Sequence, residues 1–165
     1  CSLALTSRFL VPSTLFLTAS AGLTSISQSA FAGCTKLTTV DMSACTALKS
    51  NGDKAFWGCA MLESPALPAS LESIGDAAFW GCKALKTLVL PDSVKTLGTL
   101  AYYDCTGLES IRLTDSLETI GGYAFVLDGS TLKDKIDTSN LTNEKVLKYV
   151  ADIKEPTVAE TETSK

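Results

Sequence analysis

The sequence lacks histidine entirely, in a chain of 165 residues. Histidine is the commonest general base and the commonest protein metal ligand, so its absence argues against most familiar hydrolase and metalloenzyme sites. Charge is also sparse, at 19% of residues with a net charge of −4. That balance leaves no basic footprint for nucleic-acid phosphates. We therefore expect no catalytic site, no metal, no cofactor and no nucleic-acid partner.

Long hydrophobic runs are missing too. No apolar stretch approaches the roughly 20 residues of a membrane-spanning helix, so we expect no transmembrane segment. Residues 9–21 look superficially like a signal peptide, but the repeat described below continues through them. The chain begins at Cys1, which suggests a fragment or a processed product and leaves a lipid-bearing cysteine open. Oligomeric state is not indicated.

What the chain does contain is a repeat. An alanine, an aromatic residue and, three positions after the aromatic, a cysteine recur along the chain with a nearly constant period. The anchors are Ala30-Phe31-Ala-Gly-Cys34, Ala55-Phe56-Trp-Gly-Cys59, Ala78-Phe79-Trp-Gly-Cys82, Ala101-Tyr102-Tyr-Asp-Cys105 and Ala124-Phe125-Val-Leu-Asp128. Each unit has a short apolar strand, a turn, a second extended piece, a glycine bend and an alanine-aromatic pair. One unit alone buries too little apolar surface to fold, so the units must stack as a solenoid.

The fullest unit, from Cys82 to Tyr102, resembles the BspA-like subfamily of leucine-rich repeats, which occurs mostly in bacterial surface proteins. The resemblance implies a leucine-rich-repeat solenoid of the α/β repeat class, built from short strands, turns and short helical or 3-10 segments. It implies about five coils, each of about 23–25 residues. It covers residues 15–132. The pattern departs at Asn51, at Pro65 and at Asp128. We expect Asn51 to pair backbone groups at a wider turn.

The chain outside the repeats divides into three segments. Residues 1–14 predict a degenerate first coil or N-terminal cap. Residues 133–154 predict a C-terminal cap, because Val146, Leu147, Val150 and Ile153 share one helical face; a strand at 132–136 could also cover the end. Residues 155–165 are polar and interrupted by proline, which predicts a disordered tail or linker.

Stacking turns equal repeat positions into rows. Cys34, Cys59, Cys82 and Cys105 should form a row of buried, reduced thiols, because neighbouring side chains point in parallel rather than toward each other. Cys1 and Cys45 lie outside this row. The cysteines therefore do not identify a redox compartment.

Two further rows alternate in charge from coil to coil, so that each carboxylate should lie beside an ammonium group on the next coil. These rows are Glu63, Lys86 and Glu109, and Lys49, Glu72, Lys95 and Glu118. Glu63 and Glu109 could alternatively form a hydrolytic acid/base pair. That reading is disfavoured, because the two carboxylates would lie two coils apart with a lysine between them.

Two surfaces are candidate binding sites. The outward strand positions are Thr39, Asp41, Ser64, Ala66, Thr87, Val89, Ser110 and Arg112. In a solenoid this sheet is commonly the recognition surface, although the same residues could serve β-propensity alone. The alternative is an aromatic stripe of Trp57, Trp80 and Tyr103, which could bind a protein or a glycan or could simply pack on Met61 and Leu100.

The resemblance implies adhesion or protein recognition without catalysis, at the cell surface or outside the cell. We therefore expect a non-catalytic interaction module that binds a protein or a glycan. A structural spacer without its own ligand is the alternative. A carboxylate hydrolase is the third and least favoured class.

Overall fold

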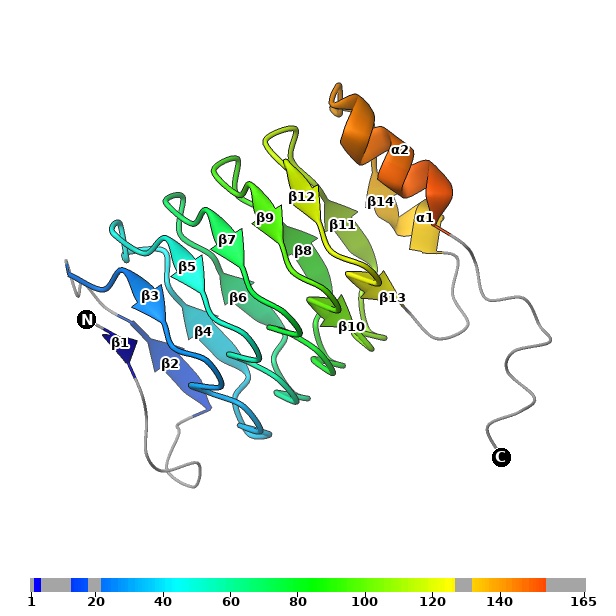
Figure 1. The fold of residues 1–165 in the computed structure, drawn as a ribbon. Helices are drawn as coiled ribbons and strands as arrows, with labels where there is room; N and C mark the ends of the chain where they lie inside the picture. Colours follow the sequence, from blue (N-terminus) through cyan, green and yellow to red (C-terminus); the bar gives the residue numbers. More distant parts are fainter. Residues whose placement is uncertain (1, 4–12, 18–21, 127–131, 154–165) are drawn as a thin grey trace, which may run out of the picture.

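The computed structural model describes residues 2–3, 13–17, 22–126 and 132–153 as one parallel β-solenoid (Figure 1). The predicted solenoid of stacked coils is thereby confirmed. Cys1, Asp128 and the predicted tail at 155–165 lie outside the described residues. No helix in the described part is both long and apolar enough to cross a membrane.

One side of the solenoid is a six-stranded parallel sheet of two-residue strands. In sheet order these are β1 (Ser2–Leu3), β3 (Ser25–Ile26), β5 (Ser50–Asn51), β7 (Ser73–Ile74), β9 (Thr96–Leu97) and β12 (Thr119–Ile120). Ile26 pairs with Asn51, Asn51 with Ile74 and Ile74 with Leu97, so each pairing joins residues that are one coil apart. Equal repeat positions therefore lie side by side, as the sequence predicts.

A second side carries two separate three-stranded sheets. The first contains β2 (Thr14–Phe16), β4 (Thr39–Asp41) and β6 (Ser64–Ala66), and the other contains β8 (Thr87–Val89), β11 (Ser110–Arg112) and β14 (Ile136–Asp137). On β8 and β11 the central residue is buried and its two neighbours are exposed. A short pair, β10 (Tyr102–Tyr103) with β13 (Phe125–Val126), lies on the third side.

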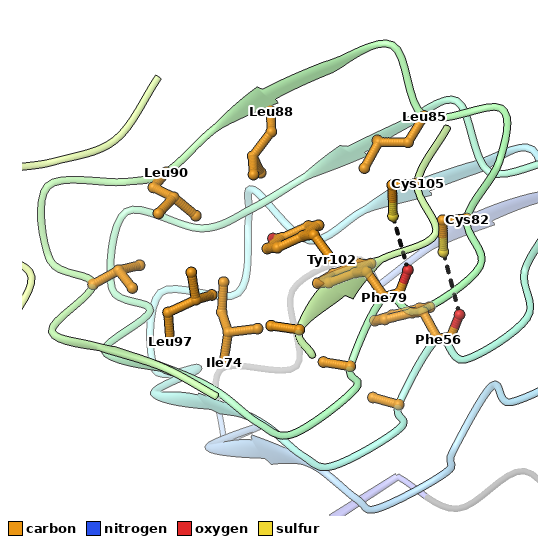
Figure 2. Close-up of a cluster of buried hydrophobic side chains, with 14 of the residues drawn as sticks. Phe56, Ile74, Phe79, Cys82, Leu85, Leu88, Leu90, Leu97, Tyr102 and Cys105 are labelled. Carbon is orange, nitrogen blue, oxygen red and sulfur yellow. Dashed lines mark hydrogen bonds between the residues drawn. The ribbon is translucent and has the colours of Figure 1, made fainter. Parts of the chain in front are cut away.

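The core contains a column of stacked aromatic rings. Phe31, Phe56, Phe79, Tyr102 and Phe125 lie one above another, with centroids 5.0–5.7 Å apart and planes within 9° of parallel. Figure 2 shows three of these rings beside the buried leucines of the strands. Each inner ring contacts the rings of the coils above and below it, so the column ties the coils together.

Close backbone contact explains the glycine that follows several strands of the six-stranded sheet. A Cβ atom on Gly75 would lie 2.6 Å from the backbone nitrogen of Asp53, and one on Gly98 would lie 2.5 Å from the carbonyl carbon of Gly75. Real Cβ atoms do not approach backbone that closely. A side chain at these positions would therefore push neighbouring coils apart.

Ion pairs between coils follow the predicted charge alternation. Lys49 Nζ lies 2.7 Å from Glu72 Oε1, Lys86 Nζ 3.0 Å from Glu109 Oε1, and Lys95 Nζ 3.7 Å from Glu118 Oε1. All six side chains are about half exposed or more, so each pair contributes only about 0.2–1 kcal/mol. Their main effect is on register, because shifting one coil against the next would place like charges side by side.

The expectation for Asn51 is wrong. Its side chain is 2% exposed, and neither its amide nitrogen nor its amide oxygen has a hydrogen-bond partner. Because Asn51 pairs in register with Ile26 and Ile74, its side chain points into the same apolar layer as theirs and not toward backbone groups.

The chain after the last complete coil forms α1 (Leu132–Lys135), β14 and α2 (Glu144–Asp152). Helix α2 lies within the segment for which a helix is predicted, and it buries Val146 and Val150. Asn143 caps this helix by accepting hydrogen bonds from the backbone N–H groups of Lys145 and Val146. The Asn143 amide also donates to the carbonyl of Leu117, which attaches the helix to the preceding coil.

Candidate functional site

The outward residues of β2, β4, β6, β8 and β11 lie on one side of the solenoid, on two adjoining sheets, and this surface is here called the strand face. All eight predicted residues lie on it: Thr39, Asp41, Ser64, Ala66, Thr87, Val89, Ser110 and Arg112. Thr39 and Asp41 are half-buried and the other six are exposed. Strand pairing aligns these residues in two rows within each three-stranded sheet, and the groove between β6 and β8 separates the two halves of each row.

Sequence reasoning missed Thr14 and Phe16 on β2 and, at the other end of the row, Asp137 on β14. Phe16 pairs in register with Asp41 and is 60% exposed, which makes it a large apolar side chain at the N-terminal end of the same row. Its signal was available, because Phe16 lies one repeat before Asp41. The row therefore reads Phe16, Asp41, Ala66, Val89, Arg112 and Asp137.

The strand face is hollowed where its two sheets fail to join. An open groove of about 470 Å³ lies between β6 and β8. It is lined by four strand-face residues, Ser64, Ala66, Thr87 and Val89, together with Pro65, Leu67, Ala69 and Pro91. None of these eight residues is charged, and Val89 is 51% exposed at the groove. The groove can accept an uncharged, apolar group.

Pro65 explains the break in the sheet. In other coils, Met42 and Leu90 occupy the repeat position two residues after that of Pro65. Their backbone N–H groups donate to the carbonyls of Ala66 and Arg112 in the following coil, at 2.9 and 3.1 Å. Alternate residues of a strand donate in the same direction, so position 65 should donate toward β8. Proline has no N–H, and the hydrogen bond from position 65 to the Thr87 carbonyl cannot form. The sheet ends at β6 and starts again at β8.

Charged groups flank the groove on both sides. The pKa of the Asp41 carboxyl is lowered by the hydrogen bond from the Ser43 hydroxyl and then by the one from the Ser43 backbone N–H, so Asp41 is ionised at neutral pH. Ser139 lowers the pKa of Asp137 in the same way, with a smaller contribution from the charge of Arg112. The face thus carries a carboxylate beyond one end of the groove and a guanidinium beyond the other.

A smaller hollow of about 250 Å³ lies beside the turns that follow the strands. Three carboxylates, Asp92, Asp115 and Asp137, line it together with Arg112. The carboxylate of Asp115 already accepts hydrogen bonds from the Thr142 hydroxyl and from the backbone N–H groups of Thr142 and Asn143. Across the described part of the chain, no group of acidic or cysteine side chains has the arrangement of a metal site.

The residues of the aromatic stripe differ in how far they are exposed to solvent. Trp57 is 44% exposed, and Met61, four residues later, is exposed as well, whereas Trp80 and Tyr103 are half-buried with ring centroids 5.0 Å apart. The stripe is therefore a partly covered apolar patch on another side of the solenoid. Its exposed part is centred on Trp57.

The buried cysteine row lies as predicted, and its geometry adds a function that sequence reasoning missed. The thiols of Cys59, Cys82 and Cys105 donate to the carbonyls of Phe31, Phe56 and Phe79 of the preceding coils, at 3.1–3.3 Å. Figure 2 shows Cys82 and Cys105 pointing in the same direction toward these oxygens. Burial raises the pKa of the Cys59 and Cys105 thiols to about 12, so they are protonated donors and poor nucleophiles.

The two carboxylates considered for hydrolysis are part of the surface charge pattern. Glu109 is paired with Lys86 and its side chain is 71% exposed, and Glu63 is exposed as well. A general acid of a glycosidase needs a sheltered carboxyl whose pKa is raised. Neither position offers that environment.

Comparisons with known proteins agree with this architecture. A family model described as the BspA type leucine rich repeat region matches residues 12–155 in six copies. A leucine-rich repeat protein from Bacteroides ovatus is 31% identical, with a TM-score of 0.62 over 71% of this chain and 32% of that one. A leucine rich cell surface protein from Faecalibacterium prausnitzii is 25% identical, with a TM-score of 0.64 over 76% of this chain and 33% of that one.

The chain thus spans about a third of the length of these two solved structures. A search of functionally curated proteins finds no match.

Proposed function

The chain belongs to the family of BspA-type leucine-rich repeat proteins, and from this membership we propose that it is a non-catalytic, adhesion-type recognition module of a cell-surface or secreted protein. The related Faecalibacterium protein is described as a cell surface protein, which supports that location. We take residues 133–154 to be a C-terminal cap, which is supported by the burial of Val146 and Val150 in α2 and by the hydrogen bond from Asn143 to the Leu117 carbonyl.

The observation that carries this proposal is the groove in the strand face. Four of the eight predicted contact residues line it, its walls are uncharged and mostly apolar, and charges of opposite sign lie beyond its two ends. Protein interfaces commonly combine such an apolar centre with a polar rim. The partner is a protein that inserts an apolar side chain between β6 and β8.

Alanine substitutions test the strand face. Thr87→Ala, Val89→Ala, Ser110→Ala and Arg112→Ala, combined in one variant, should abolish binding of the labelled protein to cultured host cells. A matched control changes Thr96 and Thr119 to alanine, because both are exposed on the opposite, six-stranded sheet. Equal losses in both variants would contradict recognition through the strand face.

The aromatic stripe is the second candidate surface, favoured by the exposure of Trp57 and Met61. Tryptophan offers a large amphipathic contact to a protein or a glycan at little entropic cost. Trp57→Ala with Trp80→Ala should abolish binding if the stripe is the site. Full binding by both this variant and the strand-face variant would instead favour the structural spacer.

A further inference from the structure

Two pairs of opposite charges on the strand face, Asp41 with Arg112 and Glu63 with Lys86, are arranged symmetrically about the groove, while Asp137 and Glu109 lie outside this symmetry. Along one row, Asp41, Ala66, Val89 and Arg112 occupy equivalent positions on four successive strands. Along the next charged row, Glu63 and Lys86 lie immediately before β6 and β8. The groove lies midway in both rows, with a carboxylate on the β6 side and a cation on the β8 side.

Such an arrangement is self-complementary. Consider a two-fold axis parallel to the strands that passes above the groove and brings a second strand face against the first. It places Asp41 of each copy opposite Arg112 of the other, and Glu63 of each copy opposite Lys86 of the other. It also places Val89 opposite Ala66, so that a larger apolar side chain faces a smaller one across each half of the groove. These are the properties of an isologous interface.

We propose that the partner of the strand face is a second copy of this chain, docked face to face about this two-fold axis. The inference rests on the proposed function, because it takes the strand face to be the recognition surface. The proposed function left the partner protein unidentified, and this inference identifies it as a second copy of the chain.

The charged groups are available for this contact. Arg112 and Glu63 are exposed, and neither has an ion-pair partner within 4.0 Å among the described residues, although Arg112 lies near enough to Asp137 for its charge to lower the pKa of that carboxyl. Lys86 is 59% exposed despite its contact with Glu109, so it can reach a second carboxylate. The groove itself contains no charge that would have to be buried on association.

The size of the face predicts a weak dimer. Five strands at about 4.8 Å spacing and three residues of about 3.3 Å each span about 240 Å². Stable interfaces bury about 800 Å² on each partner. We therefore expect a dissociation constant of about 10–100 μM at low salt, rising with ionic strength because the flanking ion pairs are screened.

Charge exchange tests the proposal by sedimentation equilibrium of the full chain from about 10 μM to 1 mM. Asp41→Arg and Arg112→Asp alone each set like charges against one another across the axis, and each should weaken association about tenfold. The double variant restores opposite charges and should associate within about threefold of the natural chain. Glu63→Lys and Lys86→Glu, alone and together, repeat this test without disturbing the turn at Asp41.

Glu118→Lys is the matched control, because it makes the same charge change beside β12 on the opposite sheet. It should leave association unchanged. A monomer at every concentration, or a dimer that ignores both charge exchanges, would overturn the proposal. If either result accompanies loss of cell binding by the strand-face alanine variant, the recognition function stands and its partner is a different protein. If the alanine variant also binds normally, both proposals fail.

Discussion

The ring of Tyr102 lies flat against the ring of Phe79, with centroids 5.0 Å apart and an angle of 4° between their planes. Tyr102 is completely buried, and its hydroxyl has no hydrogen-bond partner. The other rings of this column are all phenylalanines, so Tyr102 carries a hydroxyl that the stack does not use.

Tyr102→Phe should therefore stabilise the protein. Removing an unsatisfied buried hydroxyl relieves a desolvation cost, and we expect the free energy of unfolding to rise by about 1 kcal/mol. Urea unfolding followed by circular dichroism measures the change. Tyr123→Phe removes the same atom from a side chain that is 71% exposed and should have no effect. A loss of stability in Tyr102→Phe would show that the hydroxyl has a bonding partner.

Asn51→Leu should stabilise the chain for a related reason. Leucine has the same branching as asparagine but no polar atoms, and the neighbours of Asn51 in the sheet are Ile26 and Ile74. Two unsatisfied polar atoms are removed, so we expect a gain of about 1–3 kcal/mol in urea unfolding. Asn140→Leu is the control, because Asn140 is exposed. A destabilised Asn51→Leu protein would mean that the site needs its amide.

Pro65→Val should join the two halves of the strand face. The new N–H can donate to the Thr87 carbonyl, as valine at the equivalent Val40 position does not interrupt the sheet. Hydrogen exchange measured by mass spectrometry should show stronger protection of residues 64–67 and of 87–89. Pro91→Val also introduces an N–H, but after the end of β8, and should not protect these strands. Unchanged exchange in Pro65→Val would mean that something other than the missing donor opens the sheet.

The buried thiols predict a loss of stability in alkali. Burial raises the pKa of Cys59 and Cys105 from 9.0 to about 12, and it raises the pKa of Cys82 well above 9.0. Between pH 9 and 12 the folded chain therefore holds protons that the unfolded chain has lost. The stabilisation is complete below pH 9 and falls above it by about 1.4 kcal/mol per pH unit for each thiol.

Urea titrations from pH 7 to 10.5 under reducing conditions measure this dependence. Cys105→Ala loses packing and starts less stable, but its stability should fall less steeply with pH because one titrating group is gone. Parallel curves for Cys105→Ala and the natural chain would exclude the thiols as the cause.

Asp115 should hold helix α2 in place. Its carboxyl pKa is lowered by the Thr142 hydroxyl and then by the backbone N–H groups of Asn143 and Thr142. The stabilisation it provides is present above its unfolded pKa of about 3.8 and is lost as the pH falls through the lower folded value.

Asp115→Ala should therefore speed hydrogen exchange in α2 at neutral pH, and acid should produce the same effect in the natural chain. Asp92→Ala is the matched control, since Asp92 occupies the same repeat position one coil earlier and its carboxylate accepts a hydrogen bond from the Thr114 hydroxyl rather than from the helix. Equal exchange rates in Asp115→Ala and Asp92→Ala would show that apolar packing alone secures α2.

The solenoid could be predicted from the sequence because the same residue types recur at a nearly constant spacing. A cysteine or an aromatic residue that returns at the same place in every repeat can only mean stacked, equivalent environments, and the thiol row and the aromatic column follow from that. The outward direction of Thr87 and Val89 follows likewise from the alternation of a strand around the buried Leu88.

The groove could not be predicted the same way, because it arises where the repeat is interrupted. Pro65 was visible as a departure, but its effect depends on which neighbour its N–H would have faced, and only the register of three strands decides that. The expectation for the Asn51 side chain was wrong for a similar reason. Its polarity suggested a backbone partner, whereas its position in the sheet points the side chain into the core.

The alternating charge rows also bear on how such a chain can grow. Lysine and glutamate exchange places with each coil, so the pattern from Lys49 to Lys95 repeats only after two coils. A duplication of one coil would set like charges beside each other in both rows at once, whereas a duplication of two coils would leave every neighbour opposite in sign. Genes that encode arrays of this kind should therefore preserve even-numbered gains and losses of repeats more often than odd-numbered ones.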